Sequence, residues 1–414
     1  MQNEGPTAIG TRPPAVSDSP SGRLPLVVYV LALGTFLMLT TEFVIAGILP
    51  EVAGELHISL AQAGSLITIF AVGMVIGAPL LTLLTMRLSK KRTLVFSLAV
   101  FVAGHVVVVL SADLTILMVA RFVTALATGA FWAVSAVVAS SVVTASLKSS
   151  AVGVVAAGGS LATVLGVAIG AFVAQQLGWR GTFWALAIAA AIAVLVIARL
   201  VPADAAPSHG ASVRSELSDL RSPQLWLVLA ACLTTTGGVL AAYSYVAPIL
   251  TEQAGLSAAS VPVVLAGFGV CSFLGTLLGG RLGDRHAHAV TIATPAVTAL
   301  LLAAMALWGG SPWATIDLVV LLGAFGLSAN SVLIHLSVGY AGRAANLGSG
   351  LAVAAFNGGT AIGTTIAGAA LTGPLGLSAP ATVGAVIVTL TLIPTIALAA
   401  RARRRGAAEP MSAH

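Results

Sequence analysis

Residues 93–112 read TLVFSLAVFVAGHVVVVLSA, a run of 20 residues without an acidic or basic residue other than His105, between the basic trio Lys90-Lys91-Arg92 and Asp113. An α-helix rises about 1.5 Å per residue, so a helix of this length crosses the roughly 30 Å hydrocarbon core of a bilayer. The run is continuously apolar, whereas a strand of a membrane β-barrel alternates apolar and polar residues. The stretch therefore predicts a transmembrane helix.

The rest of the chain is similarly apolar. Of its 414 residues, 58% are hydrophobic and 8% are charged, and the mean hydropathy is +1.04. Soluble domains carry roughly 45–50% apolar and about 25% charged residues, so this composition excludes a soluble enzyme. Apolar spans are expected at residues 24–49, 60–86, 93–112, 114–145, 151–174, 181–200, 223–250, 258–280, 289–310, 315–339, 346–371 and 379–400. The predicted fold is an all-α membrane protein with twelve transmembrane helices.

The basic residues fall almost entirely on alternate connections between these spans. One set of loops and tails holds 17 Lys and Arg residues, whereas the alternate set holds only Arg180. Cytoplasmic loops of membrane proteins are enriched in Lys and Arg, so we expect both chain ends in the cytoplasm and the protein in a bacterial inner membrane. The net charge of +6 is therefore a topology signal, which indicates anionic lipid as a partner and argues against nucleic acid.

Polar segments divide the chain into five parts. We expect a disordered cytoplasmic tail (1–23), a first six-helix bundle (24–200), a cytoplasmic linker (201–222), a second six-helix bundle (223–400) and a basic cytoplasmic tail (401–414). With no soluble domain between or around the bundles, the chain is expected to act as a monomer.

The two bundles share a weak internal repeat. An offset of 198 residues places Phe70-x-Val72-x4-Gly77 on Phe268-x-Val270-x4-Gly275, and an offset of 193 residues places residues 166–170 on residues 359–363. Repeats of six helices indicate a secondary transporter whose site lies between the halves. We therefore expect two pseudo-symmetric bundles around a central cavity.

Two charged residues stand inside apolar spans, Glu42 in the first and Arg121 in the fourth. Each lies about seven residues, or roughly 10 Å, from the outer end of its helix, so we expect them at one depth. A charge within the hydrocarbon costs about 2.5–3.5 kcal/mol on insertion scales and indicates function. Two interpretations stay open. One is a static ion pair between two helices, and the other is a proton-carrying carboxylate tuned by the arginine.

Several neutral residues are weaker candidates. Polar side chains in the second bundle that are expected to line a substrate cavity are Tyr243, Tyr245, Asn330, His335 and Asn357. Interhelical hydrogen bonding is the alternative for the two asparagines, and packing is the first interpretation for both His335 and His105. Gly166 and Gly170 have the small-x3-small spacing of close helix packing, and the same face can slide between conformational states.

Motifs of enzymes are absent from the sequence, which contains neither a phosphate-binding loop nor H-E-x-x-H nor paired cysteines at metal spacing. Cys232 and Cys271 lie inside apolar spans and are interpreted as small buried hydrophobes. We expect no cofactor. Without a nucleotide site, energy for transport has to come from a gradient.

Several motifs resemble the major facilitator superfamily. Residues 280–285, Gly-Arg-Leu-Gly-Asp-Arg, match its G-x-L-x-D-R loop, and the degenerate first-half copy keeps Arg87. Thr41-Glu42-Phe43 followed by Leu49-Pro50 resembles the first-helix signature of twelve-helix drug:proton antiporters. Arg121 resembles the arginine in the fourth helix of the same antiporters. Residues that resemble the branch of chloramphenicol-resistance and arabinose/sugar-efflux exporters are 77–82, Trp179-Arg180, Thr182-Phe183, Tyr245 with Pro248, and 355–357 with Gly359.

The resemblance implies roles for particular residues. It assigns proton coupling to Glu42 and Arg121, and it implies conformational gating by Arg87, Gly166, Gly170, Gly280, Asp284 and Arg285. One departure concerns the fifth span, where Gly166-Val167-Ala168-Ile169-Gly170 lacks the proline that usually follows the central glycine. A straighter helix is expected there.

The predicted function is proton-coupled export of a small amphiphilic molecule, a drug such as chloramphenicol, by alternating access. Export of a sugar, nucleoside or related metabolite is the alternative within transport. A membrane sensor or scaffold that moves nothing is the alternative of another class, although such proteins usually add a soluble domain.

Overall fold

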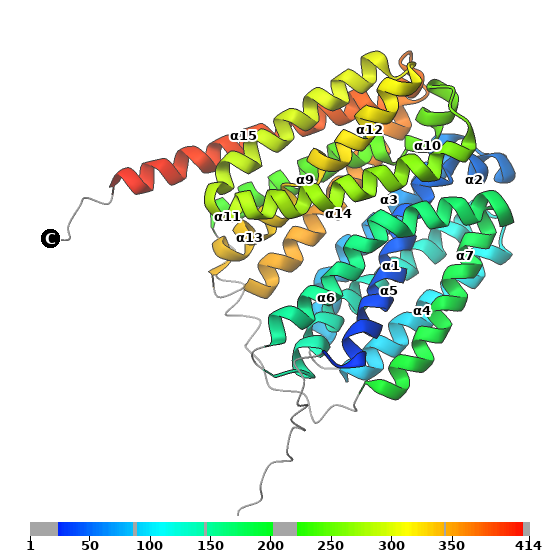
Figure 1. The fold of residues 1–414 in the computed structure, drawn as a ribbon, viewed down its shortest axis with the longest axis horizontal. Coiled ribbons are helices and arrows are strands. Elements are labelled where there is room, and N and C mark those ends of the chain that lie inside the picture. Colours follow the sequence, from blue (N-terminus) through cyan, green and yellow to red (C-terminus); the bar gives the residue numbers. More distant parts are fainter. Residues whose placement is uncertain (1–23, 86–88, 145–146, 202–221, 343–344, 409–414) are drawn as a thin grey trace, which may run out of the picture.

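The computed structural model describes residues 24–85, 89–144, 147–201, 222–342 and 345–408, and these residues form helices and short connections without a strand (Figure 1). The tail 1–23, nearly all of the linker 201–222, the gating candidate Arg87 and the last six residues of the basic tail lie outside the described residues.

The first half carries its long helices close to the predicted positions, because the apolar runs end where charged or capping residues begin. Asp113, for example, starts a helix by accepting a hydrogen bond from the Ile116 amide. The elements are α1 (Leu26–Gly47), α2 (Leu49–Leu56), α3 (Leu60–Thr85), α4 (Lys90–Leu110), α5 (Leu114–Ser141), α6 (Lys148–Leu161), the π-helix η2 (Ala162–Gly166) and α7 (Val167–Leu200).

The second half has longer merged elements. These are α9 (Pro223–Tyr243), α10 (Val246–Pro248), η4 (Ile249–Gln253), η5 (Ala258–Ser260), α11 (Val261–Trp308), α12 (Pro312–Gly326), α13 (Asn330–Tyr340), α14 (Ala345–Ala370), η7 (Gly376–Ser378) and α15 (Ala379–Ala408). The seventh span breaks after Tyr243, and Pro248 explains this because its ring cannot accommodate a helical carbonyl at Ser244, four residues earlier.

Ten stretches of the described chain are long and apolar enough to cross a membrane. Two of them, residues 148–200 and 258–308, exceed 50 residues and fold back at a kink, so each crosses twice and the fold has twelve crossings. The first kink lies at Gly178, whose φ of 73° is accessible to glycine at no steric cost. The second lies at His286.

The fifth span is less regular than the sequence predicts. A π-helix that was not predicted, η2, interrupts the span directly before Val167. The expectation of a straighter helix stays a prediction. A π-turn widens the helix by one residue and needs no proline, so the missing proline does not prevent an irregularity here. The short helix α2 after the first span was also not predicted.

Close glycine contacts reproduce the internal repeat in three dimensions. A methyl group on Gly166 would overlap the Thr40 side chain of α1, and one on Gly359 would overlap the Leu233 carbonyl of α9. Thr40 and Leu233 are separated by the same 193 residues as the two glycines. The contact between the fifth and first spans therefore recurs between the eleventh and seventh.

The offset of 198 residues also relates two matching glycine contacts. Gly77 of α3 lies against the backbone of Leu126 in α5, and Gly275 of α11 lies against the backbone of Ala324 in α12. Both the glycines and their partners are 198 residues apart. Independent pairs of contacts at matching offsets support a repeat of structure and not only of composition.

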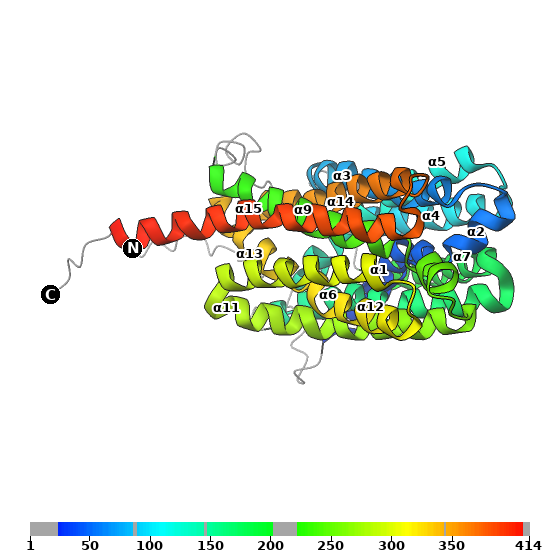
Figure 2. The same cartoon turned by 90° about the horizontal axis from the view of Figure 1, so that it is seen from above.

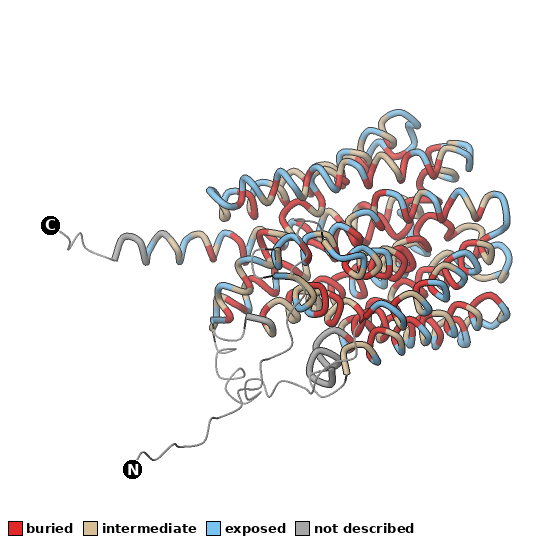
Figure 3. The backbone as a smooth tube through the Cα atoms, turned by 60° about the horizontal axis from the view of Figure 1, so that its bottom comes forward, coloured by how far each residue is buried: buried red, intermediate tan, exposed pale blue. Residues whose placement is uncertain are grey.

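The buried core shows how the halves meet. At the end where α1 starts and α15 finishes, which we call the terminal end, each half has its own core, one around Leu31, Phe101 and Phe131 and the other around Leu225 and Leu333. At the opposite end a single core joins both halves (Figure 3). The halves meet through α3 beside α14 and α7 beside α11 (Figure 2). The fold is therefore sealed at the end opposite the chain termini.

Candidate functional site

Arg121 of α5 is the most deeply placed charge, with 1% of its surface exposed. Its Nη1 donates to both the carbonyl and the hydroxyl of Thr41 in α1, each at 2.9 Å, and its Nε donates to the Leu66 carbonyl of α3 at 3.4 Å. The guanidinium also lies 4.2 Å from the centre of the Phe70 ring. One side chain thus joins three helices of the first half by charge-assisted hydrogen bonds.

Thr41 extends this network to α4. Its hydroxyl lies 2.9 Å from Nε2 of His105, and Nδ1 of His105 lies 2.7 Å from the Phe101 carbonyl. His105 is 1% exposed, and its ring stacks on the Phe101 ring at 3.9 Å between centroids. The polar groups of Thr41, His105 and Arg121 therefore form one continuous buried cluster.

Glu42 adjoins this cluster without being bonded to it. The residue is half-buried on α1, and its carboxylate makes no hydrogen bond or ion pair with any described residue. The strong bonds of Arg121 go to Thr41, the residue directly before Glu42 in α1, and not to the carboxylate.

Tyr245 closes the sealed end of the molecule. Its hydroxyl donates to the Thr364 carbonyl of α14 at 3.2 Å. The same oxygen lies so close to Gly64 of α3 and Gly368 of α14 that a methyl group on either would overlap it. The glycines belong to different halves, so this tyrosine is wedged across their boundary.

Further polar contacts cross the boundary near this tyrosine. The hydroxyls of Thr68 in α3 and Thr365 in α14 are 3.3 Å apart. The amide of Gln175 in α7 donates to the Ala258 carbonyl in the second half. These bonds bring α3 against α14 and α7 against η5.

Tyr243 lies between the sealed end and the centre of the molecule. Its ring packs on the Phe268 ring of α11, with 4.4 Å between centroids. A void of about 10 Å³ remains there, lined by Phe43, Thr163, Leu240, Tyr243, Phe268 and Leu327. These residues come from five spans of both halves, and the void is too small for a solute in this conformation.

Unpaired polar atoms mark the second half. Asn357 is 7% exposed, and its Nδ2 donates to the Val353 carbonyl at 3.1 Å, but its Oδ1 has no partner. The Oδ1 of Asn330 and the hydroxyls of Thr235 and Thr236 are likewise buried and unpaired. Buried polar groups are rarely left unsatisfied, so these atoms suit a ligand or water. His335, by contrast, is exposed on α13.

The gating candidates are dispersed. Asp284 and Arg285 are exposed on α11 near the kink and make no hydrogen bond or ion pair with described residues, and Gly280 lies beside Ser331. Gly170 lies against Val44 of α1. An ion pair does form at the sealed end, between Arg180 and Glu55.

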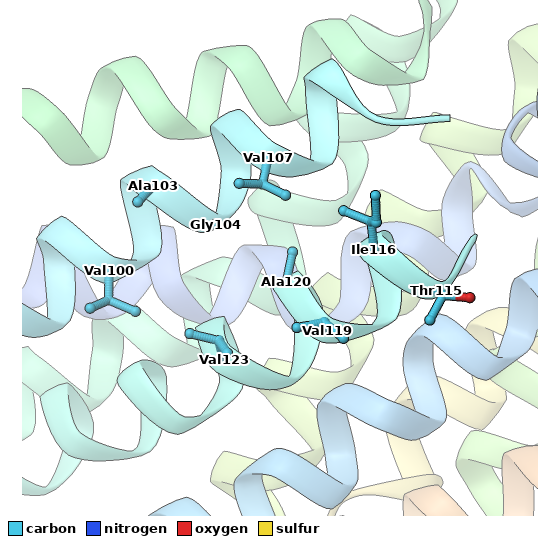
Figure 4. A pocket seen from close by; sticks show the side chains of 9 residues that line it. All are labelled: Val100, Ala103, Gly104, Val107, Thr115, Ile116, Val119, Ala120 and Val123. Atoms are coloured by element: carbon cyan, nitrogen blue, oxygen red, sulfur yellow. The ribbon is translucent and has the colours of Figure 1, made fainter. Parts of the chain in front are cut away.

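A groove of about 490 Å³ between α4 and α5 is a different feature. Its lining is Val100, Ala103, Gly104, Val107, Thr115, Ile116, Val119, Ala120 and Val123 (Figure 4). Exposed apolar side chains form most of it, and both helices cross the membrane, so it is suited to lipid and not to a polar solute. Across the described ranges, no three His, Cys, Asp or Glu side chains gather to hold a metal ion.

Sequence reasoning missed Thr41 and His105 as parts of the site. The sequence does place a threonine beside Glu42 and a histidine in a neighbouring span. It contains no signal for a bond between a guanidinium and a main-chain carbonyl, because every residue has that carbonyl.

Comparisons with known proteins show the family of the chain. The sequence model of the Major Facilitator Superfamily matches residues 31–364. The chain is 33% identical over 377 residues to the chloramphenicol resistance protein of Streptomyces lividans, covering 89% of this chain and 95% of that one. It is 32% identical to the inner membrane transport protein YdhP of Escherichia coli, covering 88% and 93%.

Other similarities support the same fold. The putative transporter AraJ of Escherichia coli is 32% identical and is covered to 89%. A solved bacterial homologue of the human lysosomal transporter Spinster, in an inward-facing and unoccupied conformation, superposes with a TM-score of 0.68 at 14% identity, covering 91% of this chain and 95% of that one.

Proposed function

The chain belongs to the major facilitator superfamily, and from this premise we propose that it exports a small amphiphilic molecule in exchange for protons. The observation that carries the proposal is the half-buried, unpaired carboxylate of Glu42 beside a buried arginine. A carboxylate without an ion pair can take up and release a proton without first breaking a strong bond. The hydrogen bonds from Arg121 to Thr41 support this role, because they hold the arginine in place while Glu42 changes charge; the Nη2 of the guanidinium is buried without a partner.

The substrate proposal follows from the chemistry of the second half. Its buried unpaired groups include neutral oxygens of Thr235, Thr236, Asn330 and Asn357, and the Tyr243 and Phe268 rings pack together in the same half. This suits a neutral or weakly polar molecule of the amphenicol type, in keeping with the name of the Streptomyces lividans relative. A sugar or nucleoside is the second candidate, because the unpaired Oδ1 atoms of Asn330 and Asn357 accept hydrogen bonds from hydroxyl groups.

We also propose that the terminal end faces the cytoplasm of a bacterial cell. The excess of Lys and Arg on the connections at that end supports this orientation. In that orientation the structure is inward-facing, and the seal around Tyr245 is the closed outer gate. The protein is proposed to work as a monomer, with no cofactor besides the proton gradient.

The direct test is uptake into inverted membrane vesicles. Chloramphenicol, a few amphiphilic dyes and a labelled pentose are offered with a proton gradient, and again after a protonophore dissipates it. We expect chloramphenicol to accumulate only with the gradient. Uptake of the pentose alone would move the substrate to the sugar class, and uptake that ignores the gradient would contradict proton coupling.

A covalent lock tests alternating access. Thr68→Cys with Thr365→Cys, in a background without Cys232 and Cys271, places two thiols where the hydroxyls are 3.3 Å apart across the halves. Oxidation is expected to join α3 to α14 and to reduce transport about tenfold or more, because the outer gate can no longer open. Thiol reduction is expected to restore it. The single variants are the controls, and full transport by the cross-linked protein would contradict this gate.

A further inference from the structure

The hydrogen bonds around His105 have a fixed direction. Its Nδ1 lies 2.7 Å from the Phe101 carbonyl, and a carbonyl oxygen can only accept, so Nδ1 carries the hydrogen. Nε2 then accepts the Thr41 hydroxyl hydrogen at 2.9 Å, which leaves the lone pairs of that oxygen to accept from Arg121 at 2.9 Å. Nη1 of Arg121, the Thr41 hydroxyl and both ring nitrogens of His105 thus have partners in one consistent direction, whereas Nη2 of Arg121 is buried without a partner.

The alternative, a doubly protonated His105, fits these contacts poorly. Thr41 would then receive hydrogens from both the imidazolium and the guanidinium, and two positive charges would share one oxygen in a region of low dielectric. The charged group that faces His105 is Arg121 of α5, whereas α1 presents Thr41, α7 presents the Phe183 ring and α4 presents Phe101. None of these offers a negative charge that would stabilise an imidazolium.

We propose that His105 is a positioning residue for proton coupling, which holds the Thr41 oxygen toward Arg121 and thereby keeps the guanidinium on Thr41 instead of on the Glu42 carboxylate. This proposal rests on the proposed function of Glu42. The buried histidine acts as a neutral acceptor and does not itself carry the transported proton. The strength of the Thr41–Arg121 bond then sets how strongly the arginine favours the charged form of Glu42.

The protonation of His105 is measurable without any substrate. The full-length protein, with ¹⁵N-labelled histidine rings, is placed in lipid nanodiscs and its ring nitrogens are followed by NMR between about pH 5 and 8. We expect one histidine to stay neutral with its hydrogen on Nδ1, and its signals to vanish in His105→Asn. Its Nε2 shift is expected to move in Thr41→Val and to stay in Thr41→Ser. An imidazolium or an Nε2–H tautomer in the wild type would overturn the proposal.

The pH profile of transport tests the effect on coupling. Thr41→Val removes the hydroxyl bond to Nη1 of Arg121 and leaves Nη1 only the bond to the Thr41 carbonyl, so the guanidinium is held less strongly and can move toward Glu42. With chloramphenicol as the probe, the pH of half-maximal transport is therefore expected to fall by about one unit. Thr41→Ser retains the hydroxyl and is expected to keep the wild-type profile. Thr35→Val is the matched control, because Thr35 is equally buried on α1 but its hydroxyl bonds only to the Leu31 carbonyl of the same helix.

The outcomes separate the two proposals. A Thr41→Val protein that transports more slowly with an unchanged pH profile would show that the hydroxyl only packs helices, and would overturn the positioning role. If wild-type protein moves no chloramphenicol, the proposed function fails for that probe, and the tautomer and its response to Thr41→Val still decide whether His105 directs Thr41 toward Arg121.

Discussion

Glu42→Gln is expected to remove gradient-driven accumulation of chloramphenicol while leaving binding of the drug intact. The amide has the shape of the protonated acid but cannot lose a proton, so the cycle loses its link to the gradient. A typical coupling free energy of 1–3 kcal/mol corresponds to a loss of about 5- to 150-fold in accumulation. Glu42 makes no hydrogen bond or ion pair with described residues, so we expect little change in thermal stability. Uptake into inverted vesicles, together with drug binding by calorimetry, measures both effects.

Glu252→Gln is the matched control for this experiment. It makes the same chemical change at an exposed position outside the membrane-spanning stretches. Accumulation by this variant is expected to equal that of the wild type. Normal gradient-driven accumulation by Glu42→Gln would contradict the proton-carrier role of Glu42. A large loss of thermal stability would favour a structural role for this residue.

The spans of the fold could be predicted from the sequence because a helix that crosses a lipid bilayer requires a long apolar run. A helix such as α4 has to be apolar along the part that crosses the lipid, whereas the basic residues of its first turn, from Lys90, and Asp113 beyond its end can be charged. The internal repeat was visible for a similar reason, because close helix contacts demand glycine at matching positions. The π-helix η2 was not predicted because its five residues have the same apolar composition as an α-helix, and α2, with eight residues, is too short to stand out as a span.

The site was predicted in part. The cost of burying a charge singled out Glu42 and Arg121, and the structure bonds Arg121 to Thr41, the residue next to Glu42. That rule directs attention to a partner of opposite charge, however, and Arg121 instead binds the oxygens of Thr41. A partner of this kind has no distinctive residue type. Its recognition requires the three-dimensional structure.

The repeat also shows that the two halves are chemically unequal at this depth. The offset of 193 places Thr235 opposite Glu42, and the offset of 198 places Val319 opposite Arg121. The second half thus has a neutral hydroxyl and an apolar side chain where the first has two charges. This asymmetry supports the proposed division of labour, in which the first half handles the proton and the second half contributes neutral contacts to substrate.

Gly359→Ala is expected to damage the second half strongly. A methyl group there would overlap the Leu233 carbonyl of α9, which is main chain and cannot move aside without displacing the helix. Overpacking of this kind costs typically 1–3 kcal/mol, so the melting temperature in detergent is expected to fall by about 5 °C. Transport is expected to fall as well, because α9 and α14 carry Tyr243, Thr236 and Asn357.

Gly350→Ala provides the comparison on the same helix. A methyl group at Gly350 would meet no heavy atom within 4 Å, and alanine favours a helix over glycine by about 1 kcal/mol. This variant is therefore expected to melt at or slightly above the wild-type temperature. If both variants melt alike, the close approach of α9 and α14 is not the source of the effect.

The equivalent contact in the first half provides a second test, because the methyl group of Gly166→Ala would meet the side chain of Thr40 and not a carbonyl. A side chain can rotate where a backbone cannot, so Gly166→Ala is expected to lose less stability than Gly359→Ala, even though the repeat makes the two positions equivalent.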